Sequence, residues 1–467
     1  MKHIFILFLL LFSVFMCSKV QQRPNAHADT SSADSPILFK KITVPKKLRV
    51  QNDSLDFGGD IRIGDLTNNG QVDFIVYRGA EGDKQGATKP CFIGAFDIFG
   101  NILWQKGEGG IQPYRPGPIA IHDIDNDGQT EVICFFYDNN EDVDPFSLEG
   151  VTIQILDGNT GEIKKQSRPK IFDDYTGKGP NWVHQRIFIA NFKGNKQPQD
   201  FIVKLGKHLV AFDHELNILW TYFNPQDKYR ECPAYIPSVG DIDGDGKDEV
   251  NGGYYLLDSG GSVMWEKKLG RNMDAVAITE WDNGNIRAFG SGFGHIIDKQ
   301  GNIILKLGKE AVPHGQEMQI ADFDVSKPGP EMIIRYNGHK PDAMLVSNKG
   351  EILNRFELNE SPNNTGMTTV FWFGKGGNTL LFNGGVLWHG WGEKFADLPD
   401  LPPSMGDKKM GWYHCIPADV CSDKREEIIT YNPWDKFIFI YTQNPYQKEQ
   451  FSKYKATPRQ YNVRLMD

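Results

Sequence analysis

The sequence has no surplus of basic residues, since 51 Lys and Arg stand against 60 Asp and Glu and the formal net charge is −9. Binding nucleic acid along a whole face needs a basic surface, so we expect no nucleic-acid partner. A local basic groove is still compatible with this balance, because net charge says little about a single site. Cysteine is also scarce: six cysteines in 467 residues with no regular spacing exclude a small disulfide-stapled domain.

Long apolar runs are missing except at the N-terminus, where MKHIFILFLLLFSVFMC is too short for a stable membrane span. This stretch predicts a lipoprotein-type signal peptide over residues 1–17 that ends at a lipidated Cys17. Ordinary signal cleavage is the alternative, because SVFM departs from the usual small-residue box. Residues 18–45 are interpreted as a polar tether. We expect an exported protein whose lipid is its sole membrane contact at the bacterial outer membrane, or a periplasmic or secreted one.

No long segment has helical periodicity, whereas short strands bounded by Gly, Asp and Asn turns recur throughout. VGDIDGDGKDEVNGGYY with LLDSGGSVMWEK and IHDIDNDGQTEVICFF with ILDGNTGEIKK show the pattern. Eight such units of roughly forty to sixty residues can be counted. Repeated units that cannot bury a face alone predict an all-β fold, a β-propeller of seven or eight blades over residues 46–467. We expect a monomer.

Two acidic turns, DIDNDGQTE and DIDGDGKDE, offer oxygen ligands at positions 1, 3, 5 and 9 with a glycine at position 6. This spacing is typical of a calcium loop and predicts a structural Ca²⁺. The alternative is that Asp and Asn form the turn by bonding their own backbone, without an ion. The candidate metal ligands are Asp123, Asp125, Asp127, Glu131, Asp241, Asp243, Asp245 and Glu249.

Four of the 11 histidines stand near the strand that opens a repeat, namely His122, His184, His314 and His414. If the units are equivalent, these histidines lie toward one end of the propeller. Cys415 and Cys421 lie close to the last of them, and unpaired core thiols are favoured there over a disulfide or a metal site.

Tyrosine and arginine are also prominent, in GGYYLLDSGGSVMWEKKLGRNMDA. Only one of Tyr254 and Tyr255 can point toward a shared pocket, because side chains alternate along a strand. The planar guanidinium of Arg271 suits a carboxylate, so a Tyr, Arg and His pocket would accept an anionic substrate. A buried Tyr–Arg packing pair is the alternative.

A resemblance covers most of residues 50–467. VGDIDGDGKDEVNGGYYLLDSGGSVMWEKKLGRNMDAVAI and the C-terminal DKREEIITYNPWDKFIFIYTQNPYQKEQFSKYKATPRQYNVRLMD resemble the propeller of family 11 rhamnogalacturonan lyases and the smaller propeller-type ulvan lyases. The acidic turns also resemble the calcium repeats of integrin-type propellers. The chain lacks room for the extra N-terminal β-domain that is usual in the rhamnogalacturonan family. Ulvan is therefore the first expected substrate, and rhamnogalacturonan is the second.

The resemblance implies β-elimination at a uronic acid in an acidic rhamnose- and uronate-containing polysaccharide. His122 and Tyr255 would exchange the protons, in an order left open, while Arg271 faces the uronate. The family's second histidine has no match in CFFYDNNEDVD, and His184 is the candidate to replace it. The substrate-binding candidates are Arg186, Arg230, Tyr229, His314 and His414. The alternative function is a non-catalytic carbohydrate-binding or adhesion propeller with integrin-like calcium repeats.

Overall fold

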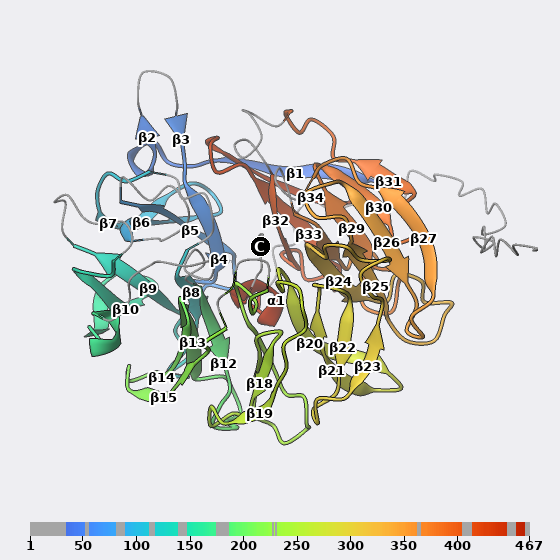
Figure 1. Ribbon diagram of the computed structural model, residues 1–467. Coiled ribbons are helices and arrows are strands. Elements are labelled where there is room, and N and C mark those ends of the chain that lie inside the picture. The colour runs from blue at the N-terminus through green and yellow to red at the C-terminus, as the bar shows by residue number, and fades with distance from the viewer. Residues whose placement is uncertain are drawn as a thin grey trace, which may run out of the picture.

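The computed structural model describes residues 34–51, 56–80, 89–111, 117–138, 147–173, 186–226, 228, 231–361, 366–403, 413–445 and 454–462. Within these ranges, eight four-stranded antiparallel sheets surround a common centre as the blades of a β-propeller (Figure 1). The all-β prediction and the count of eight repeat units are therefore confirmed, and the seven-blade alternative is wrong.

The first four blades each use four consecutive strands. The first contains β4 (Asp60–Gly64), β5 (Asp73–Gly79), β6 (Pro90–Asp97) and β7 (Ile102–Gly107). The second contains β8 (Ile119–His122), β9 (Glu131–Tyr137), β10 (Val151–Asp157) and β11 (Ile163–Ser167). The third contains β12 (Ile187–Ala190), β13 (Asp200–Leu205), β14 (His208–Asp213) and β15 (Ile218–Phe223). The fourth contains β16 (Ser238–Gly240), β17 (Glu249–Asn251), β18 (Tyr255–Leu257) and β19 (Val263–Glu266).

The next three blades follow the same rule. The fifth contains β20 (Val276–Asp282), β21 (Asn285–Gly290), β22 (His295–Ile297) and β23 (Ile303–Lys306). The sixth contains β24 (Glu317–Ala321), β25 (Glu331–Arg335), β26 (Asp342–Val346) and β27 (Ile352–Glu357). The seventh contains β28 (Thr368–Val370), β29 (Leu380–Asn383), β30 (Val386–His389) and β31 (Lys394–Asp397). A two-stranded ribbon, β2 (Val50–Gln51) and β3 (Asp56–Phe57), and two 3-10 turns, η1 (Lys46–Leu48) and η2 (Lys170–Phe172), lie outside the blades.

The eighth blade joins the two ends of the chain. It contains β32 (His414–Ala418), β33 (Glu427–Tyr431) and β34 (Phe437–Gln443), and its outermost strand is β1 (Pro36–Thr43). Pro36 pairs with Gln443 at the start of this ladder. Residues 36–43 were expected to belong to the polar tether of residues 18–45, so the tether prediction is wrong there. The propeller begins before residue 46 because this strand completes the last sheet.

A repeated hairpin between the third and fourth strands packs several blades against their predecessors. In the fourth blade, Asp258 Oδ1 accepts hydrogen bonds from the backbone of Gly260 and Ser262 at 3.0 and 2.7 Å, which fixes the turn. Gly261 then adopts a φ of 81°, and a Cβ there would lie 2.6 Å from the Trp220 ring of the third blade. Tryptophan at the outer edge of one blade therefore requires glycine in the hairpin of the next.

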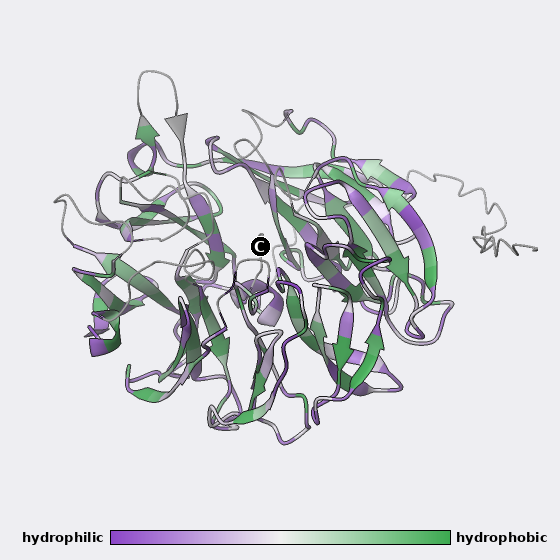
Figure 2. Ribbon diagram, in the orientation of Figure 1, coloured by the Kyte–Doolittle hydropathy of each residue, from purple (hydrophilic) through white to green (hydrophobic). Residues whose placement is uncertain are grey.

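The hydrophobic core lies within and between the sheets, and Figure 2 shows hydrophobic residues along the strands of the blades. The five cysteines in the described part of the chain, Cys91, Cys134, Cys232, Cys415 and Cys421, are buried and form no disulfide with one another, as expected for core thiols. No helix among the described residues is long and apolar enough to cross a membrane.

The first strands of neighbouring blades contact one another, so they are the innermost strands of the propeller. The short helix α1 (Pro458–Tyr461) lies near the centre and contacts β32, β4, β8 and β12 (Figure 1). Just after the helix, the Asn462 side chain both donates to and accepts from the Ile189 backbone, at 2.7 and 2.8 Å. Gln460 Nε2 donates to Pro417 O at 2.7 Å. The C-terminal segment thus connects β12, the innermost strand of the third blade, with β32, the innermost strand of the eighth blade.

Candidate active site

Buried polar side chains gather where two innermost strands begin. Asp60 is the first residue of β4, His414 is the first residue of β32, and Arg62 shares the face of Asp60 because side chains alternate along a strand. Tyr77 and Tyr431 are the cross-strand partners of Asp60 and His414. We call these five residues the central polar cluster, and each is at most 6% exposed.

The carboxylate of Asp60 is the common acceptor of the cluster. Tyr77 OH donates to Oδ2 at 2.6 Å, Tyr431 OH donates to Oδ1 at 2.5 Å, and Arg62 Nη1 lies 3.2 Å from Oδ2. Burial by itself would raise the pKa of Asp60. The charge of Arg62 and the two phenol hydrogen bonds outweigh that cost and hold the pKa below its usual value. A carboxylate therefore persists in the protein interior.

The imidazole of His414 lies beside this carboxylate. Its Nδ1 is 3.4 Å from Tyr431 OH and 3.9 Å from Asp60 Oδ1. Burial lowers the pKa of His414 to about 4, against the opposing charge of Asp60, and the charges of Arg62 and Arg186 add to the lowering. The ring is therefore neutral at neutral pH and can accept a proton.

The other members supply complementary chemistry. Burial raises the pKa of Tyr77 and of Tyr431 well above the usual value, so both phenols stay protonated and can act as donors. Arg186 stands directly before β12, is 4% exposed, and brings a planar cation close enough to influence His414. A proton acceptor, phenol donors and a guanidinium are thus combined at one end of the innermost strands, a set suited to acid–base chemistry on an anion.

A second polar pair lies at the same end of the innermost strands. His314 Nε2 is 2.7 Å from Asp274 Oδ2, and Asn272 Nδ2 donates to Asp274 Oδ1 at 2.5 Å. Asp274 stands before β20 and His314 stands before β24. The side chain of His314 is 23% exposed, so this pair is more open than the central polar cluster.

His122 lies at the opposite end of its strand. It is the last residue of β8, whereas His414 begins β32, so the expectation that the four histidines lie toward one end is wrong for His122. Its Nε2 is 2.9 Å from Pro198 O, and its ring packs 4.6 Å from the Tyr461 ring of α1. Burial lowers its pKa despite the bond to Pro198. The side chain is therefore covered by the C-terminal helix.

Tyr255 and Arg271 lie in the fourth blade and just after it. Tyr255 begins β18, a third strand, and its ring packs 4.7 Å from that of Tyr222. Burial raises its pKa well above the usual value. Arg271 is half-buried and its carbonyl accepts a hydrogen bond from Tyr254 OH at 2.9 Å. Among the described residues no contact joins His122, Tyr255 and Arg271, so their shared catalytic role stays a prediction.

Several predicted residues lie outside the described residues: Cys17, His184, Tyr229 and Arg230. Four members of the central polar cluster were not predicted from the sequence, namely Asp60, Arg62, Tyr77 and Tyr431. A usable signal was present in DIRIG, where Asp and Arg alternate with Ile on a strand that the repeat pattern places innermost.

The two acidic turns have the same backbone design. We call Asp123–Glu131 the second-blade loop and Asp241–Glu249 the fourth-blade loop. In each, the first Asp accepts from the glycine at position 6, with Gly128 N 3.2 Å from Asp123 Oδ2 and Gly246 N 3.0 Å from Asp241 Oδ2. Carboxylate oxygens of three acids lie within 4.8 Å of one another in each loop.

Charge compensation differs between the loops. In the fourth-blade loop, burial and then the neighbouring Asp243, Asp245 and Asp241 raise the pKa of Glu249 to about 8. Hard oxygen donors with uncompensated mutual repulsion fit a Ca²⁺ ion there. In the second-blade loop the acids instead face the ammonium of Lys164, whose Nζ lies 2.8 Å from Glu131 Oε1.

Comparison with known proteins finds partial relatives, and no family model matches the chain. The rhamnogalacturonan endolyase YesW and exolyase YesX of Bacillus subtilis (strain 168) are each 24% identical, over 269 and 262 residues. Each alignment covers 48% of this chain and 42% of the relative, so the matched region spans less than half of the curated relatives.

Solved structures share the fold over most of the chain. The structure of rhamnogalacturonan lyase YesW has a TM-score of 0.65 at 20% identity, covering 86% of this chain and 75% of that one. A Bacillus licheniformis rhamnogalacturonan lyase PL11 has a TM-score of 0.67 at 19% identity, covering 89% and 77%. The V. cholerae biofilm matrix protein Bap1 has a TM-score of 0.55 at 12% identity, covering 92% and 91%. At these identities the likeness shows a common propeller fold, which is compatible with more than one function.

Proposed function

We propose that this chain is a propeller-type polysaccharide lyase that cleaves an acidic rhamnose- and uronate-containing polymer by β-elimination. The single observation that carries the proposal is the central polar cluster, which combines a neutral histidine with protonated phenols at the start of the innermost strands. The relatives named rhamnogalacturonan lyases support the same chemistry. They favour rhamnogalacturonan as the first polymer to test, and ulvan, the polymer expected first from the sequence, is the second.

Arginine supplies the anion-binding part of the reaction. Cleavage removes the proton at C5 of a 4-linked uronate, and that proton becomes acidic enough only when the neighbouring carboxylate is neutralised. Arg186 is the candidate, since it is buried, its charge acts on His414, and a guanidinium can hold a carboxylate by two bonds. Arg62 is already engaged with Asp60 and is assigned to hold the carboxylate that orients the phenols.

Proton transfer is assigned to His414 and Tyr431. The neutral imidazole of His414 takes the C5 proton, the C4–O4 bond breaks, and the electron pair of the C–H bond forms the C4=C5 double bond. Tyr431 donates a proton to the departing O4, and the proton that His414 has taken restores the Tyr431 hydroxyl, which lies 3.4 Å from His414 Nδ1. His122, Tyr255 and Arg271 remain the rival set from the resemblance, and variants of Tyr255 and Tyr431 separate the two assignments.

Calcium is proposed for the fourth-blade loop alone among the two predicted turns. Asp241, Asp243 and Glu249 would hold the ion, which would neutralise their mutual repulsion and fix the connection between β16 and β17. This role is structural, because the loop follows the end of an innermost strand and the central polar cluster lies at the starts of such strands.

Export also remains a proposal. The N-terminal sequence supports a lipid anchor at Cys17 in the bacterial outer membrane, with periplasmic or secreted protein as the alternative. Mass spectrometry of the membrane fraction would detect a diacylglyceryl-modified Cys17. An unmodified N-terminus elsewhere would favour ordinary signal cleavage.

The function is tested by ultraviolet absorbance of the purified protein mixed with rhamnogalacturonan, ulvan, alginate or pectin in the presence of calcium. A rise from the C4=C5 unsaturated uronate with the first or second polymer is the expected result. Folded protein that binds one of these polymers without any absorbance change would instead support the alternative of a carbohydrate-binding propeller. Absence of both binding and cleavage would favour an adhesion role.

A further inference from the structure

The second-blade loop and the fourth-blade loop provide an internal comparison within one chain. Each joins the first and second strands of its blade, and each carries acids at positions 1, 3, 5 and 9. The final glutamate caps both loops in the same way, because Glu131 Oε2 accepts from Ile124 N and Glu249 Oε2 accepts from Ile242 N, both at 3.0 Å. Any difference in ion binding must therefore come from what faces the loops.

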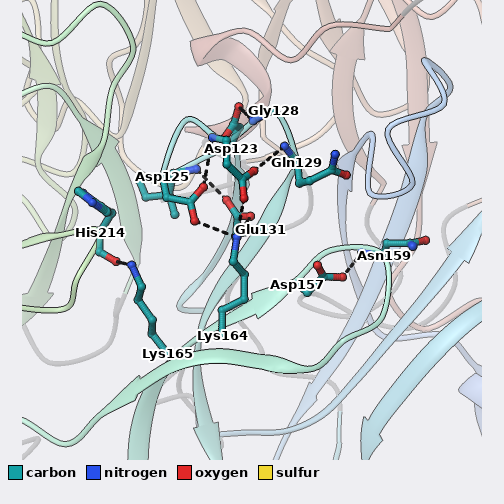
Figure 3. A network of polar contacts seen from close by, with 12 residues as sticks. Asp123, Asp125, Gly128, Gln129, Glu131, Asp157, Asn159, Lys164, Lys165 and His214 are labelled. Atoms are coloured by element: carbon teal, nitrogen blue, oxygen red, sulfur yellow. Dashed lines mark hydrogen bonds and ion pairs between the residues drawn. The ribbon is translucent and has the colours of Figure 1, made fainter.

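Lys164 faces the second-blade loop from the outermost strand of the same blade. Its Nζ lies 2.8 Å from Asp125 Oδ2, 3.1 Å from Asp127 Oδ2 and 2.8 Å from Glu131 Oε1 (Figure 3). Its three donors are thus directed to three carboxylates, which is the full donor capacity of an ammonium. Glu131 is wholly buried, so this contact is shielded from solvent more than a surface ion pair.

The fourth blade has methionine at the equivalent position. In the second blade Leu156 pairs with Ile163 after a bulge, and Lys164 follows. In the fourth blade Leu257 pairs with Val263 after a bulge at the same point, and Met264 follows. The two outermost strands therefore present their next residue in the same register. One blade places a cation there and the other a neutral thioether.

Other cations near the fourth-blade loop are placed differently. Lys247 Nζ lies 4.0 Å from Asp245 Oδ2, and Lys299 Nζ approaches the backbone carbonyl of Asp243 at 3.5 Å. Neither contacts a side-chain oxygen of Asp241, Asp243 or Glu249 among the described residues. The point where those three carboxylates converge is therefore without the ammonium that the second blade has.

We infer that Lys164 is the built-in cation of the second-blade loop, so that this loop takes no divalent ion although its sequence has the calcium pattern. Ca²⁺ needs six to eight oxygen ligands, and the ammonium already uses three of those that the loop could offer. A second cation a few ångströms from the first would also be repelled. Lys164 thereby links the outermost strand of the second blade to the loop between its first and second strands, and this link does not depend on calcium. The inference does not rest on the proposed lyase activity.

The test is the number of Ca²⁺ ions bound per protein, measured by equilibrium dialysis of the chelator-treated protein against radioactive calcium. Lys164→Met should bind one ion more than the wild type, because it gives the second-blade loop the side chain of the fourth blade. An unchanged number in folded Lys164→Met would overturn the inference. The change relative to the wild type is the readout, so ions bound elsewhere do not affect the result.

Asp127→Asn in the wild-type background tests the same inference without removing Lys164. It should leave the number of bound ions unchanged, and the loss of one ion would show that the loop binds calcium beside Lys164. This variant decides the matter if Lys164→Met does not fold. Met264→Lys should bind one ion fewer than the wild type. An unchanged number of bound ions in Met264→Lys alone would contradict the proposed ion in the fourth-blade loop and leave the assignment of Lys164 intact.

Discussion

Replacement of Tyr431 by phenylalanine is the perturbation that separates the central polar cluster from the set implied by the resemblance. The Tyr431 hydroxyl donates to Asp60 Oδ1, and its loss leaves a buried carboxylate with one donor fewer. Hydrogen bonds to charged groups contribute about 1.5–3 kcal/mol, so we expect Tyr431→Phe to lower the free energy of unfolding by that amount. If the same hydroxyl protonates the leaving oxygen, turnover should also fall by about 100-fold to 10,000-fold.

Tyr255→Phe is the matched control, because the chemical change is the same and the residue is equally buried. The described contact of Tyr255 is ring packing against Tyr222, which phenylalanine keeps, so the substitution should change the free energy of unfolding by less than about 1 kcal/mol. Turnover should be retained. Denaturant unfolding and the rate of unsaturated uronate formation measure the two quantities. Retained activity in Tyr431→Phe together with lost activity in Tyr255→Phe would refute the reasoning and favour the set implied by the resemblance.

Three further predictions concern pH, packing and calcium. His414 has a folded pKa of about 4, below the ordinary 6.5, so the folded state binds fewer protons than the unfolded state between these values. The contribution of His414 to the free energy of unfolding is intact above pH 6.5 and decreases by about 3 kcal/mol as the pH falls to 4. Chemical denaturation should show this loss in the wild type and not in His414→Gln. Gly161→Ala places a Cβ 2.5 Å from the Trp104 ring at a φ of 73° and should destabilise the protein by about 2 kcal/mol or more. Gly128→Ala is the control, because no atom lies within 4 Å of its Cβ, and it should show only the cost of a positive φ. Thermal unfolding measures both variants. Asp243→Asn should abolish the increase in melting temperature that calcium gives the wild type, and an unaltered increase would argue against an ion in the fourth-blade loop.

The architecture was predictable from the sequence because its signals are local. A hairpin such as the one at Asp258 lies within a few residues, and its repetition shows that units of one kind are stacked. The strand of residues 36–43 was missed because the strand that it pairs with, β34, is about four hundred residues away in the sequence. Nothing in its own pattern distinguishes an outermost strand from a tether.

The candidate site was predictable only in part. The positions of His414 at the start of an innermost strand and of His314 just before one could be deduced from the repeats. The convergence of Tyr77 and Tyr431 on Asp60 could not, because it depends on closure of the ring between the first and last blades. The Lys164 contact is similar, since the acidic turn is visible in the sequence but the lysine that faces it comes from another strand.

The most direct test of the central claim is the initial rate of C4=C5 unsaturated uronate formation from rhamnogalacturonan or ulvan, measured for the wild type and for His414→Gln in parallel. The account predicts product from the wild type and a rate lower by at least about 100-fold in a folded His414→Gln protein. Equal rates in the two proteins would contradict a catalytic role for the central polar cluster.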